Sequence, residues 1–510
     1  MCGIAANYGD VDRAAGERML ERLAHRGPDD TGSVTVSDRA WLGHTRLSIV
    51  DVEGGQQPLS TEEPEMWLVG NGEIYNHEDV RQTFDGRIFS TRSDNEVALH
   101  LISERGVGAI DELSGMYAFL AASTDGRFIA ARDPVGIKPL YWARREDDIR
   151  FASEMRAFDA EWLPLVEFFP PGHYWTPDEG LVRFERAVPA SALKRYPGPD
   201  SPDAPMPDDM LRETREVLVS SVDRQMMGDV DVGVFLSGGL DSSLVAAIAA
   251  DYLRARGKRL QTFAVGTEHS GDLLAARAVA EHIGSEHRER IYTARDARES
   301  LPEVVRVIES FDPSLVRSAV PNHMLAELAA QHVKVVLTGE GADEIFAGYP
   351  YYHRDFPEPG DLHDELVRTI EGLHNLNLQR TDRVSMAHGL EARVPFLDRE
   401  VIAFGLHLPA GWKVAGPDHP EKRLLRQAFD GWLPEELLWR TKEEFGTGSG
   451  AQEVLTGAVE AEITDEELAA ERDQLDPPIR SKEELAYYRI LKLALPGLAA
   501  GEAIGRFANP

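Results

Sequence analysis

The segment Val234-Phe235-Leu236-Ser237-Gly238-Gly239-Leu240-Asp241-Ser242-Ser243 joins a short apolar run to a glycine-rich turn and to the start of a helical pattern, which continues through residues 244–250. Main-chain N–H groups and the positive end of a helix dipole converge in such a strand–turn–helix arrangement, which therefore binds anions. Serine hydroxyls add donors, and Asp241 can hold Mg²⁺ against bound phosphates. The segment predicts a phosphate-binding loop rather than an ordinary helix N-cap after a turn.

The sequence around this loop has the pattern of an α/β domain. Apolar runs at residues 232–236, 261–265 and 333–337 predict buried strands, and long helical patterns separate them, which is typical of a parallel sheet. An acidic segment, Thr338-Gly339-Glu340-Gly341-Ala342-Asp343-Glu344, follows the third run. Carboxylates in that position suit metal and ammonium binding, although a solvated turn has a similar composition. The chain contains no G-x-x-x-x-G-K-[ST] pattern, which argues against an ordinary kinase or P-loop NTPase.

A proline-rich segment divides the chain. Prolines at positions 197, 199, 202, 205 and 207 fall within residues 196–207 and predict a semi-rigid linker, because proline disfavours both helix and central strand. We expect a first domain at residues 2–195, the linker at 196–209 and a second domain at 210–510. Before the linker, short β-like runs alternate with turn residues, which indicates antiparallel sheets; they lie at residues 40–42, 66–70, 116–122, 128–131 and 140–143.

The only cysteine is Cys2, and removal of Met1 would place a thiol and a free α-amine on one residue. An α-amine has a pKa of about 7.7–8, so a neutral fraction near pH 7 can serve as a base for the thiol. Attack on a carboxamide creates an oxyanion that needs donors. Asn71 and Gly72 can supply them from a turn after residues 67–69, although an Asn-Gly pair is also the strongest signal of an ordinary hairpin turn.

Two charged residues of the first domain suit the two ends of an amino-acid substrate. Arg46 can pair bidentately with a carboxylate, and Asp94 can hold an ammonium group. Taken alone, each would more often be a surface charge.

Composition and charge exclude several classes of protein. The formal charge of −33, from 54 basic and 87 acidic residues, argues against a nucleic-acid partner, because a phosphate backbone is bound by clustered Lys and Arg. No apolar run approaches the roughly 20 residues that cross a bilayer, and the N-terminus has no signal-peptide core. One cysteine cannot form an internal disulfide, so we expect a reducing compartment, by default the cytoplasm.

Five segments of the first domain, in order, resemble the class II glutamine amidotransferase domain: Met1-Cys2-Gly3-Ile4, His25-Arg26-Gly27-Pro28-Asp29, Arg46-Leu47-Ser48-Ile49-Val50-Asp51, Asn71-Gly72-Glu73-Ile74-Tyr75-Asn76 and Arg132-Asp133-Pro134-Val135-Gly136-Ile137-Lys138-Pro139-Leu140-Tyr141. The resemblance implies an α+β fold of the N-terminal-nucleophile type, with two stacked antiparallel sheets between helices in four αββα layers. It also implies that Cys2 is the nucleophile and its own amine the base. Asn71 and Gly72 would form the oxyanion hole. The glutamine-binding residues would be Arg46, Leu47, Asn71, Gly72, Glu73 and Asp94.

The second domain resembles the ATP-pyrophosphatase family at residues 237–243, and members of that family cleave ATP between the α and β phosphates. Residues 314–317, 390–398 and 439–445 resemble the glutamine-hydrolysing asparagine synthetase family, so the likeness extends from Cys2 to about Leu491. It implies ATP, glutamine and aspartate as substrates, Mg²⁺ as the metal and a homodimer. The implied ATP-binding residues are Leu236, Ser237, Gly238, Gly239, Leu240, Asp241, Ser242, Ser243, Val265, Gly266, Thr338, Gly339 and Glu340.

The same resemblance implies a mechanism. The β-carboxylate of aspartate attacks the α-phosphorus of ATP to give β-aspartyl-AMP and pyrophosphate, and ammonia from glutamine then attacks the acyl carbon. Glu340 is our candidate for removing a proton from that ammonia, and Arg317 and Lys442 are candidates for neutralising the phosphates. Aspartate would be held by Glu340, Asp343 and Arg317, and Mg²⁺ by Asp241 and Asp343. An apolar tunnel between the domains would keep ammonia unprotonated.

Two departures from the family pattern leave the acceptor open. Arg383 stands where lysine is expected, and Thr338 stands where serine is expected. Arginine keeps the charge but changes the geometry. A related enzyme that amidates a different carboxylate therefore stays an alternative. A β-lactam-forming relative is disfavoured by the presence of Cys2, Arg46 and Asn71, and a scaffold protein without activity is disfavoured by intact motifs at both sites.

Overall fold

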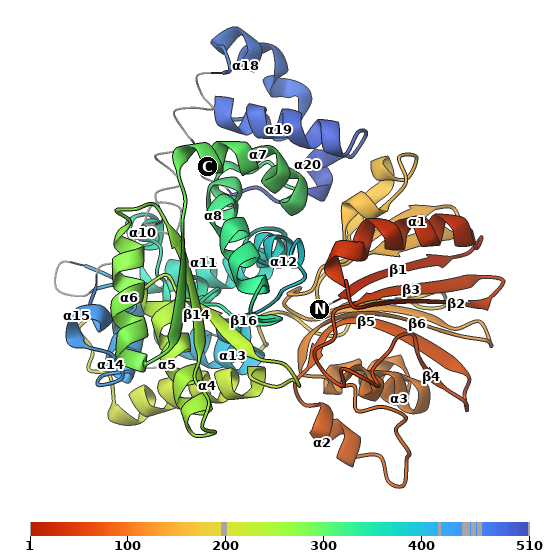
Figure 1. Ribbon diagram of the computed structural model, residues 1–510, viewed down its shortest axis with the longest axis horizontal. Coiled ribbons are helices and arrows are strands. Elements are labelled where there is room, and N and C mark those ends of the chain that lie inside the picture. Colours follow the sequence, from red (N-terminus) through yellow and green to blue (C-terminus); the bar gives the residue numbers. More distant parts are fainter. Residues whose placement is uncertain are drawn as a thin grey trace.

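The computed structural model describes residues 2–194, 201–416, 420–440, 449, 455 and 462–507 of the chain. Figure 1 shows two halves side by side: residues of the first 190 or so positions form one half, and the rest of the chain forms the other. Lys442, residue 195 of the expected first domain and residues 196–200 of the expected linker lie outside the described residues, and helix α4 begins at Asp208 within the expected linker range.

The N-terminal half contains two antiparallel sheets of six strands each. The first has the order β10-β8-β9-β1-β3-β2 and the second the order β12-β11-β7-β6-β5-β4. The strands of the first sheet are β1 (Cys2–Tyr8), β2 (Asp30–Ser37), β3 (Ala40–Arg46), β8 (Tyr141–Arg145), β9 (Asp148–Ala152) and β10 (Val166–Phe168). The strands of the second are β4 (Leu59–Thr61), β5 (Met66–Ile74), β6 (Gly115–Ser123), β7 (Phe128–Arg132), β11 (His173–Thr176) and β12 (Gly180–Arg183).

Helices cover the outer faces of these two sheets. Helix α1 (Arg13–Leu23) lies on the first sheet, and α2 (His77–Gln82) and α3 (Asn95–Arg105) lie on the side of the second (Figure 1). Every residue of β1 is buried, because that strand lies between α1 on one side and the second sheet on the other. The predicted four-layer α+β arrangement is confirmed.

The expected turn at Asn71 and Gly72 is wrong. Both residues lie inside β5, which pairs with β6 without a break from Met66 to Ile74. Gly72 nevertheless keeps a left-handed backbone, with φ +138°, and a Cβ there would lie 1.9 Å from the carbonyl oxygen of Met116. The glycine is needed for this close approach between strands, so the tertiary pairing overrides the local turn signal of Asn-Gly.

The C-terminal half contains a parallel sheet of five strands in the order β15-β14-β13-β16-β17. Its strands are β13 (Val232–Phe235), β14 (Gln261–Gly266), β15 (Glu286–Ile291), β16 (Val335–Leu337) and β17 (Glu391–Arg393). The three predicted strand runs are confirmed as β13, β14 and β16, although β16 begins two residues later than expected. The α/β class of this half is therefore confirmed.

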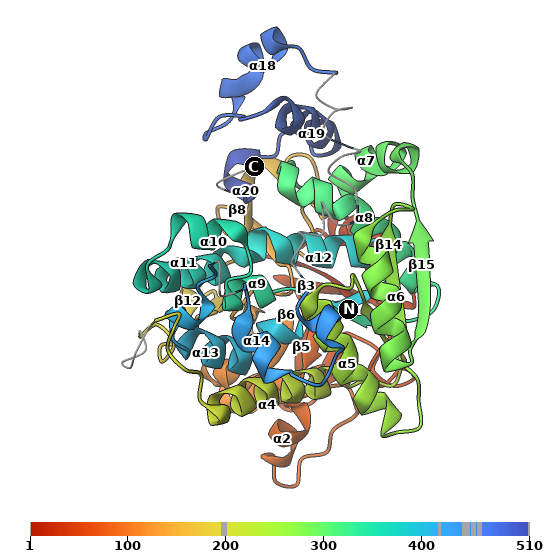
Figure 2. The ribbon, with the colours of Figure 1, turned by 90° about the vertical axis from the view of Figure 1, so that its left-hand side faces the viewer.

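Helices surround the parallel sheet, and Figure 2 shows α5 and α6 together on one side of it. The helices are α4 (Asp208–Gln225), α5 (Leu240–Arg254), α6 (Gly271–Ile283), α7 (Ala294–Ile308), α8 (Pro313–Ala330), α9 (Ala342–Phe346), α10 (Pro350–Asp355), α11 (Pro359–Gly372), α12 (Asn377–Met386), α13 (Arg399–His407), α14 (Arg423–Ala428), α15 (Glu435–Leu438), α18 (Asp465–Glu471), α19 (Lys482–Ala494) and α20 (Ala500–Ala503). Short 3₁₀ turns occur at Ala24–Arg26, Val107–Glu112, Met155–Ala157, Leu163–Leu165, Leu373–Asn375, Pro395–Leu397, Ala410–Lys413 and Arg472–Gln474.

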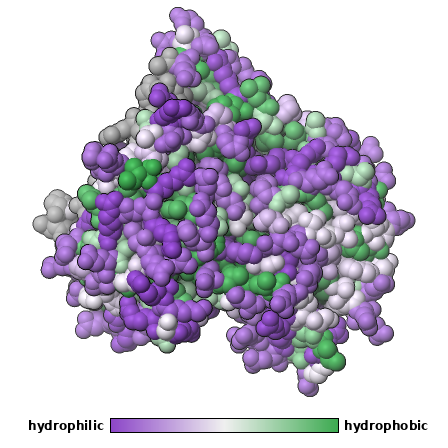
Figure 3. All heavy atoms as spheres, in the orientation of Figure 1, coloured by the Kyte–Doolittle hydropathy of each residue, from purple (hydrophilic) through white to green (hydrophobic). Residues whose placement is uncertain are grey.

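Hydrophilic side chains cover most of the face shown in Figure 3. Among the helices that the structure describes, none combines the length and the apolar character that crossing a bilayer requires.

Buried charges join the two halves. Arg26, which is fully buried, donates from Nε to the carbonyl oxygen of Cys2 at 3.0 Å and from Nη1 to Glu154 at 2.7 Å. Its guanidinium also makes a two-pronged contact with Asp382 of α12, at 2.8 and 3.1 Å. Arg383 donates to the carbonyl oxygen of Ser153 at 2.9 Å. Arg383, the unexpected arginine of the sequence, thus belongs to the contact between the halves.

We predict that Arg26→Met strongly destabilises the protein. The change removes the cation that contacts the buried Glu154 and Asp382 at 2.7 and 2.8 Å and leaves only the longer contacts of Arg383, at 3.5 and 3.6 Å, to span both. Breaking a buried ion pair on one side costs about 3–5 kcal/mol. A fall in the midpoint of thermal unfolding measures the loss. Arg13→Met removes an exposed pair with Glu17 and should change the midpoint little. Equal midpoints for the two variants would contradict the prediction.

Two candidate catalytic sites

The first site surrounds Cys2 at the start of β1. A small cavity there is lined by Cys2, Arg46, Leu47, Ile49, Val50, Gly55, Gln57, Gly72, Glu73, Ser93, Asp94 and Asn95. Of the residues predicted to bind glutamine, only Asn71 is not among them. Asn71 adjoins the cavity all the same, because its side-chain oxygen accepts a hydrogen bond from the main-chain N–H of Cys2 at 2.9 Å. The structure thus brings the predicted glutamine residues together around one thiol.

Asn71 has a donor to spare. Its Nδ2 is buried and has no hydrogen-bond partner within the described part of the chain. A buried amide that donates to nothing is costly unless a ligand completes it. An oxyanion that forms beside the Cys2 thiol would do so. Burial raises the pKa of that thiol, so the thiol needs a base, and its own α-amine is the base that the sequence proposes.

The two ends of this cavity carry opposite charges. The Arg46 guanidinium is buried and donates only to main-chain oxygens among the described residues, those of Val50, Asp51 and Val52, at 2.7 to 3.2 Å. Its charge therefore remains for a carboxylate. Asp94 accepts from the N–H of Ile74 at 2.7 Å. Burial raises the pKa of both Asp94 and Glu73, and a substrate ammonium beside them would reverse that effect.

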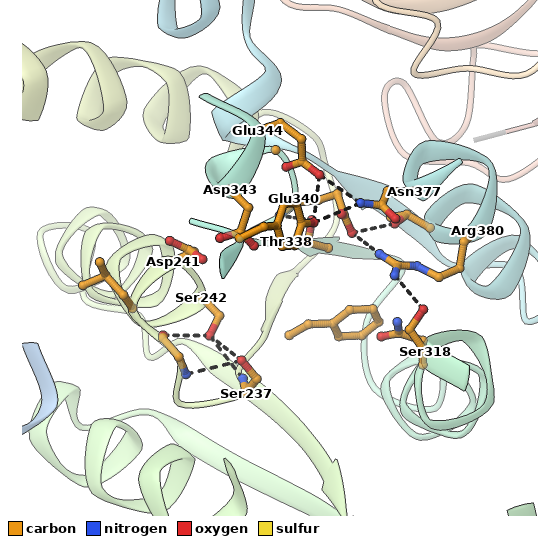
Figure 4. A pocket seen from close by; sticks show the side chains of 18 of the residues that line it. Ser237, Asp241, Ser242, Ser318, Thr338, Glu340, Asp343, Glu344, Asn377 and Arg380 are labelled. Atoms are coloured by element: carbon orange, nitrogen blue, oxygen red, sulfur yellow. Dashed lines mark hydrogen bonds and ion pairs between the residues drawn. The ribbon is translucent and has the colours of Figure 1, made fainter. Parts of the chain in front are cut away.

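The second site is a cavity of about 390 Å³ in the C-terminal half. It lies between the turn that follows β13, the turn that follows β16 and helices α8 and α12 (Figure 4). The predicted residues that line it are Leu236, Ser237, Gly239, Leu240, Asp241, Ser242, Val265, Arg317, Thr338, Gly339, Glu340 and Asp343. Gly238, Ser243 and Gly266 were also predicted to contact ATP but are not among its lining residues.

Serine side chains hold the glycine-rich turn in shape. The Ser242 hydroxyl accepts from the N–H of Ser237 at 3.2 Å and lies 3.0 Å from the Ser237 hydroxyl (Figure 4). Ser243 donates to the carbonyl oxygen of Gly239 at 2.7 Å and so supports the turn from behind. Gly238 has φ +76°, and a Cβ there would lie 2.5 Å from Ala275. Gly238 and Ser243, two of the three predicted ATP-binding residues that do not line the cavity, therefore stabilise the turn itself.

Two carboxylates face each other at the floor of this cavity. Asp241 comes from the start of α5 and Asp343 from α9, and Figure 4 shows them side by side. The ammonium of Lys422 contacts both. Because both carboxylates contact one ammonium, they lie close together, and Mg²⁺ binds proteins through one or two carboxylates plus substrate phosphates. Within the described residues no group of three or more His, Cys, Asp or Glu could hold a metal by itself.

Glu340 is fixed by helix α12. Arg380 donates to its carboxylate, and the Thr381 hydroxyl donates to the same oxygen at 3.0 Å. Arg380 also donates to Ser318 at 2.8 Å (Figure 4). These residues hold the carboxylate in one orientation at the edge of the cavity. The sequence did not single out Arg380, Thr381 or Lys422, because each lies in a polar run without a distinctive motif.

Arg317 lines the cavity but already has a carboxylate partner. Glu483 of α19 accepts from its Nε at 3.0 Å and also contacts its Nη2. The Tyr487 hydroxyl donates to the same carboxylate at 2.8 Å. Arg317 can therefore reach a bound substrate only by sharing or leaving this pair. Helix α19 thus holds one residue of the cavity wall in place, which the sequence did not indicate.

Each half of the chain matches a family of known proteins. The glutamine amidotransferase domain family matches residues 1–167, and the asparagine synthase family matches residues 213–359 and 354–492. The chain is 39% identical over 476 residues to asparagine synthetase [glutamine-hydrolyzing] 3 of Arabidopsis thaliana, which covers 88% of this chain and 79% of that protein. It is 35% identical over 544 residues to a probable asparagine synthetase [glutamine-hydrolyzing] of Dictyostelium discoideum, covering 99% of this chain and 96% of the other. The chain belongs to the glutamine-hydrolysing asparagine synthetase family. The resemblance inferred from the sequence motifs is confirmed.

The buried carboxylate of Glu344 has a raised pKa. The Glu344 carboxylate is buried and accepts from the Tyr349 hydroxyl and the Asn377 amide, each at 2.9 Å. Burial and the nearby charges of Glu340 and Asp343 raise its pKa to about 7. Its Oε2 has no hydrogen-bond partner among the described residues.

We predict that Glu344→Gln stabilises the protein more at pH 8 than at pH 5. A folded-state pKa near 7, above the unfolded value, means that stability from the protonated carboxyl is present at low pH and is lost as pH rises through 7. Glutamine keeps an acceptor for Tyr349 and Asn377 but does not ionise. Thermal unfolding of both proteins should show a gain for the variant of about 2–3 kcal/mol at the higher pH relative to the lower. A difference that does not change with pH would contradict this.

Proposed function

We propose that this chain makes asparagine from aspartate, with glutamine as the nitrogen donor and ATP as the energy source. One observation carries the proposal: a single chain holds a buried thiol beside an unsatisfied amide donor, and also a serine-lined phosphate turn that faces two carboxylates. The first arrangement suits hydrolysis of a carboxamide, and the second suits nucleotide chemistry. Membership of the family supports the pairing of these two activities.

In the first site Cys2 is the proposed nucleophile. Its α-amine, freed by removal of Met1, takes the thiol proton, and the thiolate attacks the side-chain amide of glutamine. Asn71 Nδ2 and the main chain at Gly72 stabilise the oxyanion. Arg46 binds the α-carboxylate of glutamine, and Asp94 and Glu73 bind its ammonium, with Leu47 completing the wall. The unpaired charge of Arg46 and the raised pKa values at the opposite end support this orientation.

In the second site the turn at residues 237–243 is proposed to bind the β- and γ-phosphates of ATP. A carboxylate is a poor acyl donor because oxide leaves badly, so attack of the aspartate β-carboxylate on the α-phosphorus replaces oxide by AMP as the leaving group. Mg²⁺ between Asp241 and Asp343 would offset the charge of the departing pyrophosphate. Glu340, oriented by Arg380 and Thr381, then accepts a proton from the attacking ammonia.

The remaining parts of the proposal concern the whole molecule. We propose domains at residues 2–195 and 210–510 with a linker between, ammonia transfer through the contact between the halves, a homodimer and a cytoplasmic location. The contact between the halves lies between the two sites and contains buried charged groups such as Arg26 and Asp382. A sealed route has a physical motive, because protonated ammonia is not a nucleophile.

Lys442 and Arg317 are proposed to neutralise phosphate, and Glu340, Asp343 and Arg317 to hold aspartate.

We predict that Cys2→Ala abolishes asparagine synthesis from glutamine but leaves synthesis from ammonium salts intact. Asn71→Ala should lower the rate of glutamine hydrolysis by about 10²–10³-fold, because it removes one oxyanion donor, and should also leave ammonia-dependent synthesis in place. The assay measures asparagine, glutamate, AMP and pyrophosphate together. Release of ADP and phosphate would contradict the proposed reaction. Release of AMP only with acids other than aspartate would contradict it as well.

We predict the opposite pattern for Glu340→Gln. This variant should hydrolyse glutamine at the wild-type rate, because Glu340 lies in the other cavity, yet make little asparagine from either nitrogen source. Loss of a positioned general base typically lowers a rate by about 10²–10⁴-fold. A Glu340→Gln enzyme that used ammonia as well as the wild type would rule out the assigned role.

A further inference from the structure

Lys422 occupies the place between the two carboxylates that we propose as metal ligands. Its ammonium lies 2.5 Å from Asp241 Oδ2 and contacts Asp343 Oδ1. The side chain is 2% exposed. Lys422 lies 181 positions from Asp241 in the sequence. It directly precedes α14, and its side chain extends into the cavity. The contact is therefore a product of the tertiary fold rather than of a local motif.

The surrounding chain is shaped to admit this lysine. Lys422 itself has φ +55°, a left-handed conformation that side-chain-bearing residues rarely adopt. Gly348 packs against the pair: a Cβ at this position would lie 1.8 Å from Asp343 Oδ1 and 2.3 Å from Lys422 Cε. A strained backbone and a residue without a side chain thus combine to seat one ammonium between Asp241 and Asp343.

The charges at this place oppose the entry of a divalent cation by itself. Asp241 and Asp343 together carry two negative charges, and Lys422 already supplies one positive charge at contact distance. A divalent cation that entered alone would meet that ammonium in a buried place, where like charges repel strongly. A nucleotide changes the balance, because its phosphates give both the metal ion and the displaced ammonium a negative partner.

The arginines that line the cavity in the described part of the chain already have partners. Arg317 pairs with Glu483, Arg380 with Glu340, and Arg440 lies 3.2 Å from Asp272. Within the described residues, Lys422 contacts both carboxylates of the proposed metal-ligand pair. Its flexible four-carbon stem lets the ammonium move within the same cavity, whereas a planar guanidinium is held by its paired hydrogen bonds.

We propose that Lys422 is a positioning residue that fills the divalent-cation place between Asp241 and Asp343 until a nucleotide arrives, and so makes metal binding at this pair depend on ATP. The inference rests on the proposed function, because it takes a metal–nucleotide complex as the ligand of the cavity. Entry of the complex moves the ammonium from the carboxylates to the phosphates. Free Mg²⁺ without nucleotide is kept out.

Binding of Mn²⁺ to the full chain tests the proposal without any turnover. Protein-bound Mn²⁺ is measured by electron paramagnetic resonance, with and without ATP, in the absence of aspartate, glutamine and ammonium, and corrected with protein-free solutions. Wild type should bind Mn²⁺ tightly only with ATP. Lys422→Met should bind Mn²⁺ without ATP about tenfold or more tightly than wild type, because two carboxylates lose their cation. Lys422→Arg, which keeps the charge, should stay close to wild type in the absence of ATP.

Lys413→Met is the matched control. Lys413 is equally buried, at 2% exposure, but donates to the carbonyl oxygen of Gly405 and is not among the residues that line the cavity. This variant should bind Mn²⁺ as the wild type does. An unchanged Mn²⁺ affinity in folded Lys422→Met would overturn the proposal. Tight Mn²⁺ binding by wild type without ATP would overturn it too, and that result needs no variant to fold.

The same experiment separates this inference from the proposed function. If ATP adds no bound Mn²⁺ to any of the proteins while Lys422→Met still gains affinity without ATP, the proposed use of ATP fails and the blocking role of Lys422 stands. If ATP adds Mn²⁺ to wild type and Lys422→Met gains nothing without ATP, the proposed use of ATP stands and the role of Lys422 fails.

Discussion

Arg26 carries a positive charge into the contact between the two halves, where water cannot solvate it. The fold compensates that charge with Glu154 from its own half, Asp382 from the other and the carbonyl oxygen of Cys2. Desolvated ions are tolerated only when their partners stand at good geometry. The position of α12 relative to β1 is thereby constrained. Since α12 also carries Arg380 and Thr381, the same helix faces the interface with one set of residues and orients Glu340 with another.

Both sites hold polar atoms that the protein leaves incomplete. Asn71 Nδ2 and Glu344 Oε2 are buried and have no hydrogen-bond partner in the part of the chain that the structure describes. Each such group costs about 1–3 kcal/mol until something completes it. Glu344 lines the larger cavity and Asn71 adjoins the smaller one, so both of these costs fall beside a cavity. A ligand that supplies the missing partners gains binding free energy that the free protein does not have.

Much of the fold follows from patterns of short range. The apolar runs that become β13, β14 and β16 are long enough, and regularly enough separated by helices, to predict a parallel sheet. Strand β15 escaped prediction because its sequence, Glu286–Ile291, is largely charged and it lies at the sheet edge, where one side meets solvent. Strand β17, with three residues, is too short for any periodicity. The turn expected at Asn71 failed because pairing with β6 outweighed a local preference.

The sequence by itself determined the chemical parts: a thiol at position 2, a glycine- and serine-rich turn between strand and helix, and an acidic segment after another strand. These features depend on neighbours within a few positions, which backbone geometry and local hydrogen bonding control. Only the tertiary structure decided which charges meet, such as Arg26 with Asp382 and Lys422 with Asp241. The two residues of these pairs lie 356 and 181 positions apart in the sequence. Charge pairing at such separations has no sequence period, because it depends on how all of the intervening chain packs.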